Sequence, residues 1–142
     1  MKTTFGPVGA EISVYIPFCD TDCGGVVSNV AYLRYVELAR MALFSALGMP
    51  ATDMLESGLF ATVVRTEIDY RAPVRLGDMV KVAARLTTVE RVRAVCAFDL
   101  DAEAPDGTLR RVAEATQTVA LVRMPQGRPE RIPKEWAGLV SP

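Results

Sequence analysis

One segment restricts the possible folds more than any other feature of this sequence. Residues 30–47 read VAYLRYVELARMALFSAL, eighteen positions without glycine or proline, and Gly48 follows them directly. The segment predicts a helix about 27 Å long, which Ser28 or Asn29 can cap and Gly48 can end. Its strongly polar positions fall within one arc and are Arg34, Glu37, Arg40 and Ser45. Because apolar side chains occupy most of the remaining circumference, we expect other elements to bury most of this helix.

The rest of the sequence predicts a sheet that can cover the helix. A short β-rich run occupies residues 12–18, and segments with a period of two follow at residues 62–71, 80–88, 92–100 and 109–124. In the first of these segments one predicted face carries Thr62, Val64, Thr66, Ile68 and Tyr70, and in the third the apolar face carries Val92, Ala94, Cys96, Phe98 and Leu100. Long strands with one apolar and one charged face are typical of a curved antiparallel sheet with one side in water. We therefore predict an α+β fold in which about five strands wrap around one long central helix.

The sequence predicts a single domain. Its 142 residues are enough to bury a core, and neither a repeat nor a linker divides residues 1–142. Prolines at 125, 129 and 133 follow the last strand, so we expect an irregular C-terminal tail over residues 125–142. No stretch of 18 apolar residues is free of charge, and the N-terminal residues lack an apolar signal core. We therefore expect neither a membrane span nor a secretion signal.

Charge and composition exclude several classes of function. The formal net charge is −1, which offers no general attraction to nucleic acid. The chain contains no histidine, so mechanisms built on Ser-His or Cys-His pairs are excluded. Its three cysteines, Cys19, Cys23 and Cys96, are an odd number in a chain without a predicted secretion signal, which indicates reduced thiols in a cytoplasm. Without histidine these cysteines do not make a zinc site, and we expect no metal.

Two aspartates and a glycine turn stand directly before the predicted helix. Residues 18–29 read FCDTDCGGVVSN. Aspartate and glycine are common before helices as capping and turn residues, so Asp20 and Asp22 can be purely structural. A catalytic role for one of these carboxylates is the alternative.

Two motifs stand out in the sequence. The first consists of Asp20-Thr21-Asp22, Gly25-Val26-Val27, Asn29, Tyr32-Leu33-Arg34-Tyr35, Glu37 and Ala39-Arg40. The second, YRAPVRLGD, runs from Tyr70 to Asp78. Together with the order of elements, these motifs resemble the hotdog fold, and specifically the acyl-CoA thioesterase family typified by 4-hydroxybenzoyl-CoA thioesterase. The likeness extends over residues 13–124. It implies hydrolysis of an acyl-CoA or aroyl-CoA thioester to a free acid and coenzyme A, without a separate cofactor because coenzyme A is part of the substrate.

The resemblance implies a role for each part of the first motif. Asp22 matches the catalytic carboxylate, either as the nucleophile on the thioester carbonyl or as the base for a water, and Asp20 is expected to be structural. The backbone amide of Asn29 would stabilise the oxyanion, because the first amides of a helix lack internal partners and carry partial positive charge. Gly25 would let the backbone approach the substrate closely. Imidazole is not needed, since a thiolate leaves with little proton donation.

Other residues are expected to bind the substrate. Ser28 and Tyr32 are predicted at the acyl group, and the acyl pocket is expected to include Tyr32, Tyr35, Phe60 and Val64. Arg91 and Arg93 lie on a charged strand face, where they either meet the phosphates of coenzyme A or are simply solvated.

The resemblance also implies a homo-oligomer, a dimer at minimum and usually a tetramer, with active sites between subunits. Glu37 and Arg40 lie one helical turn apart and can pair, as a structural pair or at the edge of an interface. Some relatives carry histidine where this chain has Val26. Two alternatives to an acyl-CoA thioesterase therefore stay open, an acyl-carrier-protein thioesterase and a non-catalytic acyl-thioester-binding protein.

Overall fold

The long central helix forms close to its predicted bounds. The computed structural model describes residues 8–141, and α1 (Asn29–Ala46) is its longest helix. Ser28 takes the N-cap position with extended backbone, but its side chain makes no capping hydrogen bond. At the other end Gly48 has a φ of 85°, a left-handed conformation that glycine adopts without steric cost. The helix therefore ends where the glycine was expected to end it.

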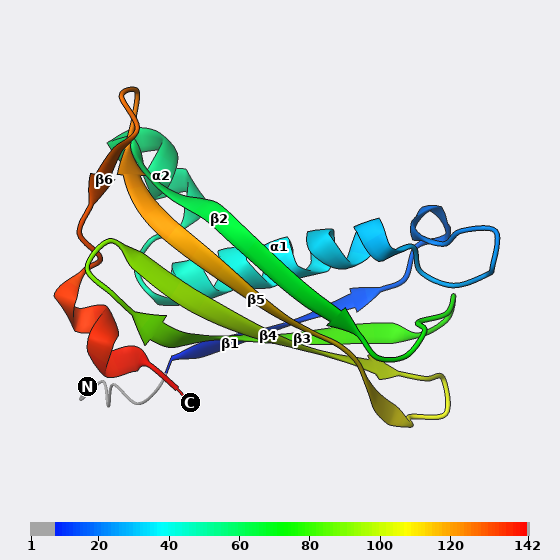
Figure 1. Ribbon diagram of the computed structural model, residues 1–142. Coiled ribbons are helices and arrows are strands. Elements are labelled where there is room, and N and C mark those ends of the chain that lie inside the picture. The colour runs from blue at the N-terminus through cyan, green and yellow to red at the C-terminus, as the bar shows by residue number, and fades with distance from the viewer. Residues whose placement is uncertain (1–7, 142) are drawn as a thin grey trace.

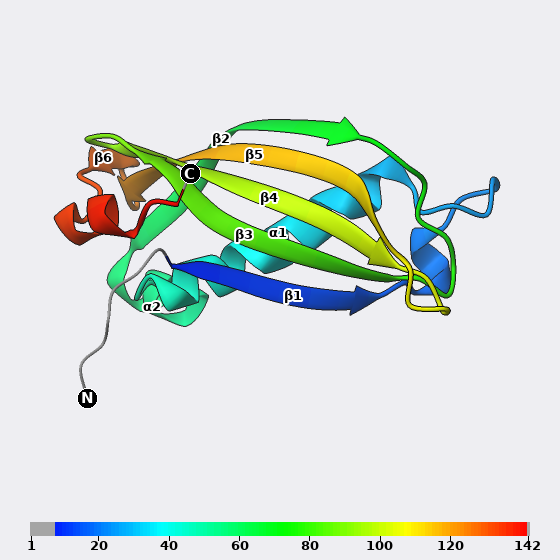
Figure 2. The same ribbon diagram turned by 90° about the horizontal axis from the view of Figure 1, so that it is seen from below.

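A single antiparallel sheet curls around α1, as Figures 1 and 2 show. Its strands are β1 (Gly9–Tyr15), β2 (Leu59–Tyr70), β3 (Met79–Val89), β4 (Arg93–Glu103), β5 (Leu109–Arg123) and the short β6 (Arg128–Glu130). The main order is β1-β3-β4-β5-β2, and β6 pairs with the end of β5. Five long strands around one central helix confirm the predicted architecture. A short helix α2 (Ala51–Ser57) connects α1 to β2.

The core lies between α1 and the concave face of the sheet. In β4 the predicted inward residues are all fully buried, namely Ala94, Cys96, Phe98 and Leu100. They face the buried side of α1, which carries Ala31, Tyr32, Tyr35, Val36, Ala39, Leu43 and Phe44. The period-two pattern of β4 thus predicted its orientation correctly, because every second side chain of a strand points to the same face.

The predicted inward face of β2 is wrong in its first half. A register shift lies between Val63 and Arg65. Before the shift, Ala61 and Val63 pack against the core, while Thr62 and Val64 are exposed. After it Ile68 packs inward, as predicted. A bulge at Val64 inserts one extra residue and so reverses which alternate positions face the core.

The predicted irregular tail is also wrong for much of its length. Residues 128–130 form β6, and residues 134–139 form a 3-10 helix, η2 (Lys134–Leu139). Trp136 of η2 is only 1% exposed, and its ring lies 5.6 Å from that of Phe44, centroid to centroid. Burying a large aromatic side chain stabilises a fixed path for the chain despite the prolines. No helix within residues 8–141 is long and apolar enough to cross a membrane.

Candidate active site

The first motif forms a tight reversal just before α1. Thr21 and Val27 pair across it as an isolated antiparallel bridge. The Asp22 amide donates to the Val26 carbonyl at 2.9 Å, and the Gly25 amide donates to the Asp22 carbonyl at 3.0 Å. Gly25 has a φ of 72°, which the turn requires and glycine tolerates. In Figure 1 this loop projects from the end of the molecule at which α1 begins.

The Asp22 carboxylate is exposed, and only one of its two oxygens accepts a hydrogen bond within residues 8–141. Its Oδ1 accepts a hydrogen bond from the Gly24 amide at 2.9 Å. A Cβ on Gly24 would lie 3.2 Å from the same oxygen, closer than ordinary van der Waals contact. The other oxygen, Oδ2, has no hydrogen-bond partner among residues 8–141. The turn therefore orients this carboxylate and leaves one oxygen available.

The start of α1 offers unpaired donors. The Ala31 amide bonds the Ser28 carbonyl at 3.0 Å, whereas the amides of Asn29 and Val30 have no acceptor in the described part of the chain. Such amides carry the positive end of the helix dipole and suit an anion or a developing oxyanion.

A cleft of about 350 Å³ lies beside these amides. Its walls are Val27, Asn29, Tyr32, Tyr70, Arg71, Ala72 and Pro73. The Tyr70 hydroxyl donates to the Asn29 carbonyl at 3.2 Å, and its ring meets Tyr32 edge to face at 5.1 Å. Burial raises the pKa of Tyr32, and the neighbouring Tyr70 raises it further, so this phenol stays neutral. The sequence interpretation missed Tyr70 as a site residue, although its position at the start of the second motif was a usable signal.

Asp20 anchors the first motif to α1. This carboxylate is buried, accepts a hydrogen bond from the Tyr35 hydroxyl at 2.6 Å, and forms an ion pair with Arg34. Its backbone carbonyl accepts the Ser28 amide at 2.9 Å. Burial first, and then the bond to Asp20, raise the pKa of Tyr35, so its hydroxyl remains a donor. The expectation that Asp20 is structural agrees with these contacts.

Backbone contacts with the second motif hold the first motif in place. The Val27 amide donates to the Val74 carbonyl at 2.8 Å, and Val26 bridges to Arg75. Asp78 is buried below this segment, where it accepts the Arg75 amide at 2.9 Å and the Arg110 guanidinium at 2.7 Å. Burial alone would raise the pKa of Asp78, but these two bonds outweigh it and lower the pKa below its ordinary value. The sequence interpretation assigned no role to Asp78 or Arg110.

A family model described as the thioesterase-like superfamily matches residues 16–139. The chain belongs to this superfamily. It is 30% identical over 128 residues to the acyl-CoA thioesterase YbgC of Haemophilus influenzae, covering 89% of this chain and 90% of that protein. The family and the hotdog fold inferred from the two motifs are therefore confirmed.

Solved structures agree with this fold. A hypothetical protein from Thermus thermophilus superposes with a TM-score of 0.77 at 26% identity, over 92% of this chain and 96% of that one. The 4-hydroxybenzoyl-CoA thioesterase of a Pseudomonas species superposes with a TM-score of 0.81 at 19% identity, over 92% of this chain and 98% of that one.

Within this thioesterase-like chain, only some predicted site residues come together. Asn29 and Tyr32 line the cleft, but Gly25, Ser28 and Asp22 are not among the described residues of its walls. The other predicted acyl-pocket residues, Tyr35, Phe60 and Val64, are also absent from the described walls of this cleft. Tyr35 instead contacts Asp20 from within the core.

Within one chain, Arg91 and Arg93 lie far from the cleft, toward the opposite end of the sheet. Arg93 pairs with Ala120, which pairs with Thr62 of β2, whereas the cleft lies at Tyr70. Eight strand residues span about 26 Å. A single chain therefore does not bring these arginines to the cleft, and their contact with coenzyme A remains a prediction that requires another subunit.

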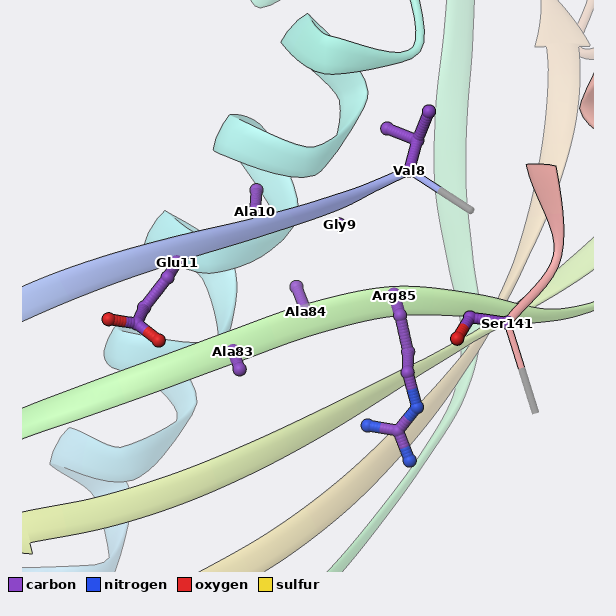
Figure 3. A pocket seen from close by; sticks show the side chains of 8 residues that line it. All are labelled: Val8, Gly9, Ala10, Glu11, Ala83, Ala84, Arg85 and Ser141. Carbon is purple, nitrogen blue, oxygen red and sulfur yellow. The ribbon is translucent and has the colours of Figure 1, made fainter. Parts of the chain in front are cut away.

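Two further features are not among the described walls of the cleft. A hollow of about 370 Å³ where β1 and β3 run side by side is walled mainly by small residues (Figure 3). Its Arg85 is paired with Asp99 at 2.9 Å. Cys19 and Cys23 are exposed thiols, while burial raises the pKa of Cys96 to about 12 and leaves it unreactive. No cluster of three or more metal-ligating side chains occurs within residues 8–141.

Proposed function

We propose that this protein hydrolyses acyl-CoA or aroyl-CoA thioesters to a free acid and coenzyme A, with Asp22 as the catalytic carboxylate. The observation that carries the proposal concerns a turn that leads directly into α1. Among residues 8–141, Oδ2 of Asp22 on this turn and the amides of Asn29 and Val30 at the start of the helix have no hydrogen-bond partner. The acyl-CoA thioesterase activity named for the Haemophilus influenzae relative supports the substrate class.

In the proposed reaction the Asp22 carboxylate and the amides at the start of α1 have different roles. Either Oδ2 attacks the thioester carbonyl carbon to form a mixed anhydride, which water then hydrolyses, or Oδ2 takes a proton from a water that attacks the same carbon. In both routes the carbonyl oxygen becomes an oxyanion, which helix amides stabilise, and the C–S bond breaks to release the thiolate.

We further propose that the working unit is a homo-oligomer. β2 is an edge strand, and its outer edge has no partner strand among residues 8–141. Pairing two β2 edges antiparallel would continue the sheet, as exposed edges tend to do. It would also reverse the partner, which brings the partner's Arg91 and Arg93 toward the end of the sheet that carries the cleft. The separation of these residues within one chain supports a site shared between subunits.

A thiol-release assay tests the function. The panel pairs short, medium and long aliphatic acyl-CoAs with aromatic ones, and compares wild type with Asp22→Asn and with Asp53→Asn, an exposed aspartate of α2. We expect turnover in wild type and Asp53→Asn, and loss of at least about 100-fold in Asp22→Asn. An active Asp22→Asn enzyme would eliminate the proposed mechanism. Binding of acyl-CoA without turnover in wild type would favour the non-catalytic alternative.

Trapping separates the two routes. Hydroxylamine added during turnover converts an acyl-Asp22 anhydride to a hydroxamate on the peptide that contains residue 22, which mass spectrometry detects. An unmodified peptide under turnover supports the route in which Asp22 activates water.

A further inference from the structure

Tyr70, the last residue of β2, makes two contacts with the first turn of α1. Its hydroxyl donates to the Asn29 carbonyl at 3.2 Å. Its ring meets the buried ring of Tyr32 edge to face, with centroids 5.1 Å apart and an angle of 85° between the planes. In Figures 1 and 2 the end of β2 lies at the same end of the molecule as the start of α1. The two contacts place the phenol beside the unpaired amides of the helix.

The backbone around Tyr70 fixes the direction of its side chain. Tyr70 pairs with Ala113 in the ladder between β2 and β5. The amides of the next two residues both donate to the Val112 carbonyl, at 2.8 and 3.2 Å. The contact with Tyr32 has the edge-to-face geometry that aromatic pairs prefer. The hydroxyl is therefore presented to Asn29 from a fixed backbone, although the side chain is 48% exposed.

The Asn29 carbonyl and the Val30 amide belong to the same peptide group. This group is planar and its C–N bond has partial double-bond character, so a donor that binds the oxygen also makes the N–H more positive. Within a helix such a carbonyl accepts one bond from the amide four residues later, and its second lone pair can accept the Tyr70 hydroxyl. The Val30 amide has no acceptor among residues 8–141. The phenol therefore acts on a peptide whose N–H is available to a ligand.

We propose that Tyr70 is a positioning residue for thioester hydrolysis and acts through the peptide between Asn29 and Val30. Its hydroxyl holds this peptide in place and strengthens the Val30 N–H as a donor to the oxyanion, without touching the reacting atoms. This role rests on the proposed function, because it uses the helix amides as the oxyanion donors. A half-exposed phenol on the neighbouring strand thereby contributes to catalysis across 41 positions of the chain.

Two other roles for Tyr70 predict different behaviour. A tyrosine that only packs on Tyr32 acts through its ring, which phenylalanine retains. A tyrosine that only lines the cleft, beside Tyr32 and Pro73, acts on substrate binding. The proposed role requires the hydroxyl and stabilises the transition state more than the bound substrate, so it affects kcat more than KM. Tyr70→Phe therefore separates the three roles.

Steady-state kinetics on acyl-CoA provides the first test. Removing a complete oxyanion donor lowers kcat about 100- to 1,000-fold, and one hydrogen bond strengthens its neighbour by about 10–30%. On a logarithmic scale, Tyr70→Phe should therefore lower kcat about 2- to 8-fold with little change in KM. Tyr15→Phe, which removes an exposed hydroxyl from β1 outside the cleft, should change neither. Circular dichroism verifies that both variants are folded. An unchanged kcat, or a raised KM at constant kcat, would overturn the proposal.

Infrared spectroscopy tests the effect on the carbonyl itself. The probe is octanoyl-CoA or benzoyl-CoA, whichever binds more tightly, labelled with ¹³C at the thioester carbonyl and bound to Asp22→Asn, in which turnover is blocked. Hydrogen bonds to a carbonyl oxygen lower the frequency of its stretching band, so we expect the bound band to lie below that of the free thioester. Adding Tyr70→Phe should reverse part of this shift, whereas adding Tyr15→Phe should not. Equal bands with and without the Tyr70 hydroxyl would contradict the proposed role.

Failure of this role can be told apart from failure of the proposed function. An active Asp22→Asn enzyme would remove that carboxylate from the mechanism, yet the effect of Tyr70→Phe on kcat would still decide the role of the phenol. If the wild-type protein binds thioester without turnover, hydrolysis is excluded, and the infrared comparison between wild type and Tyr70→Phe still decides whether the hydroxyl polarises the carbonyl. A bound carbonyl without any shift would overturn both the oxyanion assignment and the role of Tyr70.

Discussion

Tyr35 donates its hydroxyl hydrogen to Oδ2 of Asp20 at 2.6 Å, and this bond ties the loop of the first motif to the helix that follows it. Asp20 precedes Asp22 by two residues, and its carbonyl also holds the Ser28 amide. The position of the proposed catalytic carboxylate therefore depends on a buried bond to a residue inside α1.

Removing this hydroxyl tests its importance. We expect Tyr35→Phe to lower the free energy of unfolding by about 1–3 kcal/mol, because the buried Asp20 carboxylate loses a donor. Tyr15→Phe is the control, since Tyr15 is 79% exposed, and it should change stability by less than about 0.5 kcal/mol. Urea denaturation of the three proteins measures the difference. Equal midpoints and slopes for both variants would show that the bond contributes nothing.

The same bond predicts a pH dependence in alkali. Burial and then the bond to Asp20 raise the pKa of Tyr35 above its ordinary value of 10.0. The folded state therefore keeps a proton that the unfolded state releases, so this contribution to stability is complete below pH 10 and declines as the pH rises further. Wild type should lose stability more steeply than Tyr35→Phe above pH 10, while the raised pKa of Tyr32 affects both proteins. Parallel curves would contradict the assignment.

Alanine substitutions at two adjacent glycines should have different effects, one on catalytic activity and the other on stability. An alanine Cβ at Gly24 would lie 3.2 Å from Oδ1 of Asp22, so Gly24→Ala should displace the carboxylate and reduce kcat/KM by at least about 10-fold with little loss of stability. At Gly25 a Cβ meets nothing within 4 Å, but φ is 72°. Gly25→Ala should therefore cost about 1–2 kcal/mol of stability. Thermal unfolding and thioester kinetics on both variants separate these effects, and a reversed pattern would contradict the proposed role of the turn.

Adjacent arginines provide a matched comparison at the second motif. Arg110→Met removes the guanidinium from the buried Asp78 and should cost about 2 kcal/mol. Arg111→Met breaks a more exposed pair with Asp101 and should cost less than about 1 kcal/mol. The pKa of Asp78 is lowered in the fold, so its contribution is present above its ordinary pKa of 3.8 and declines below it. The excess cost of Arg110→Met should thus shrink as the pH falls below 3.8, and a cost independent of pH would refute the pairing.

Arg91 and Arg93 should affect binding of the nucleotide part of the substrate. We expect the Arg91→Ala/Arg93→Ala variant to raise KM for acyl-CoA about 10-fold through lost charge-assisted contacts with phosphate. KM for the matching N-acetylcysteamine thioester, which has no phosphate, should stay the same. Arg131→Ala is the control, because Arg131 is an exposed residue between β6 and η2. Equal effects on both substrates would indicate that these arginines act on the fold and do not contact phosphate.

Much of the fold could be predicted from local patterns. The limits of α1 follow from eighteen residues without glycine or proline, and the alternation in β4 correctly identified its buried face. The alternation in β2 failed at Val64, because nothing in the local pattern shows where a strand takes an extra residue. The prolines of the tail suggested irregular structure, but burial of Trp136 beside Phe44 outweighed that local preference.

The sequence by itself determined the central helix, the long strands and the family, because hydrophobic periodicity and short motifs depend on residues close together in the chain. Only the tertiary structure decided which groups surround the first motif. Tyr70 reaches Asn29 across 41 positions, and Arg110 reaches Asp78 across 32. Contacts of this kind depend on how the sheet curls around α1, and this geometry comes from the packing of the whole core. The separation of Arg93 from the cleft has the same origin, since strand length and pairing set it.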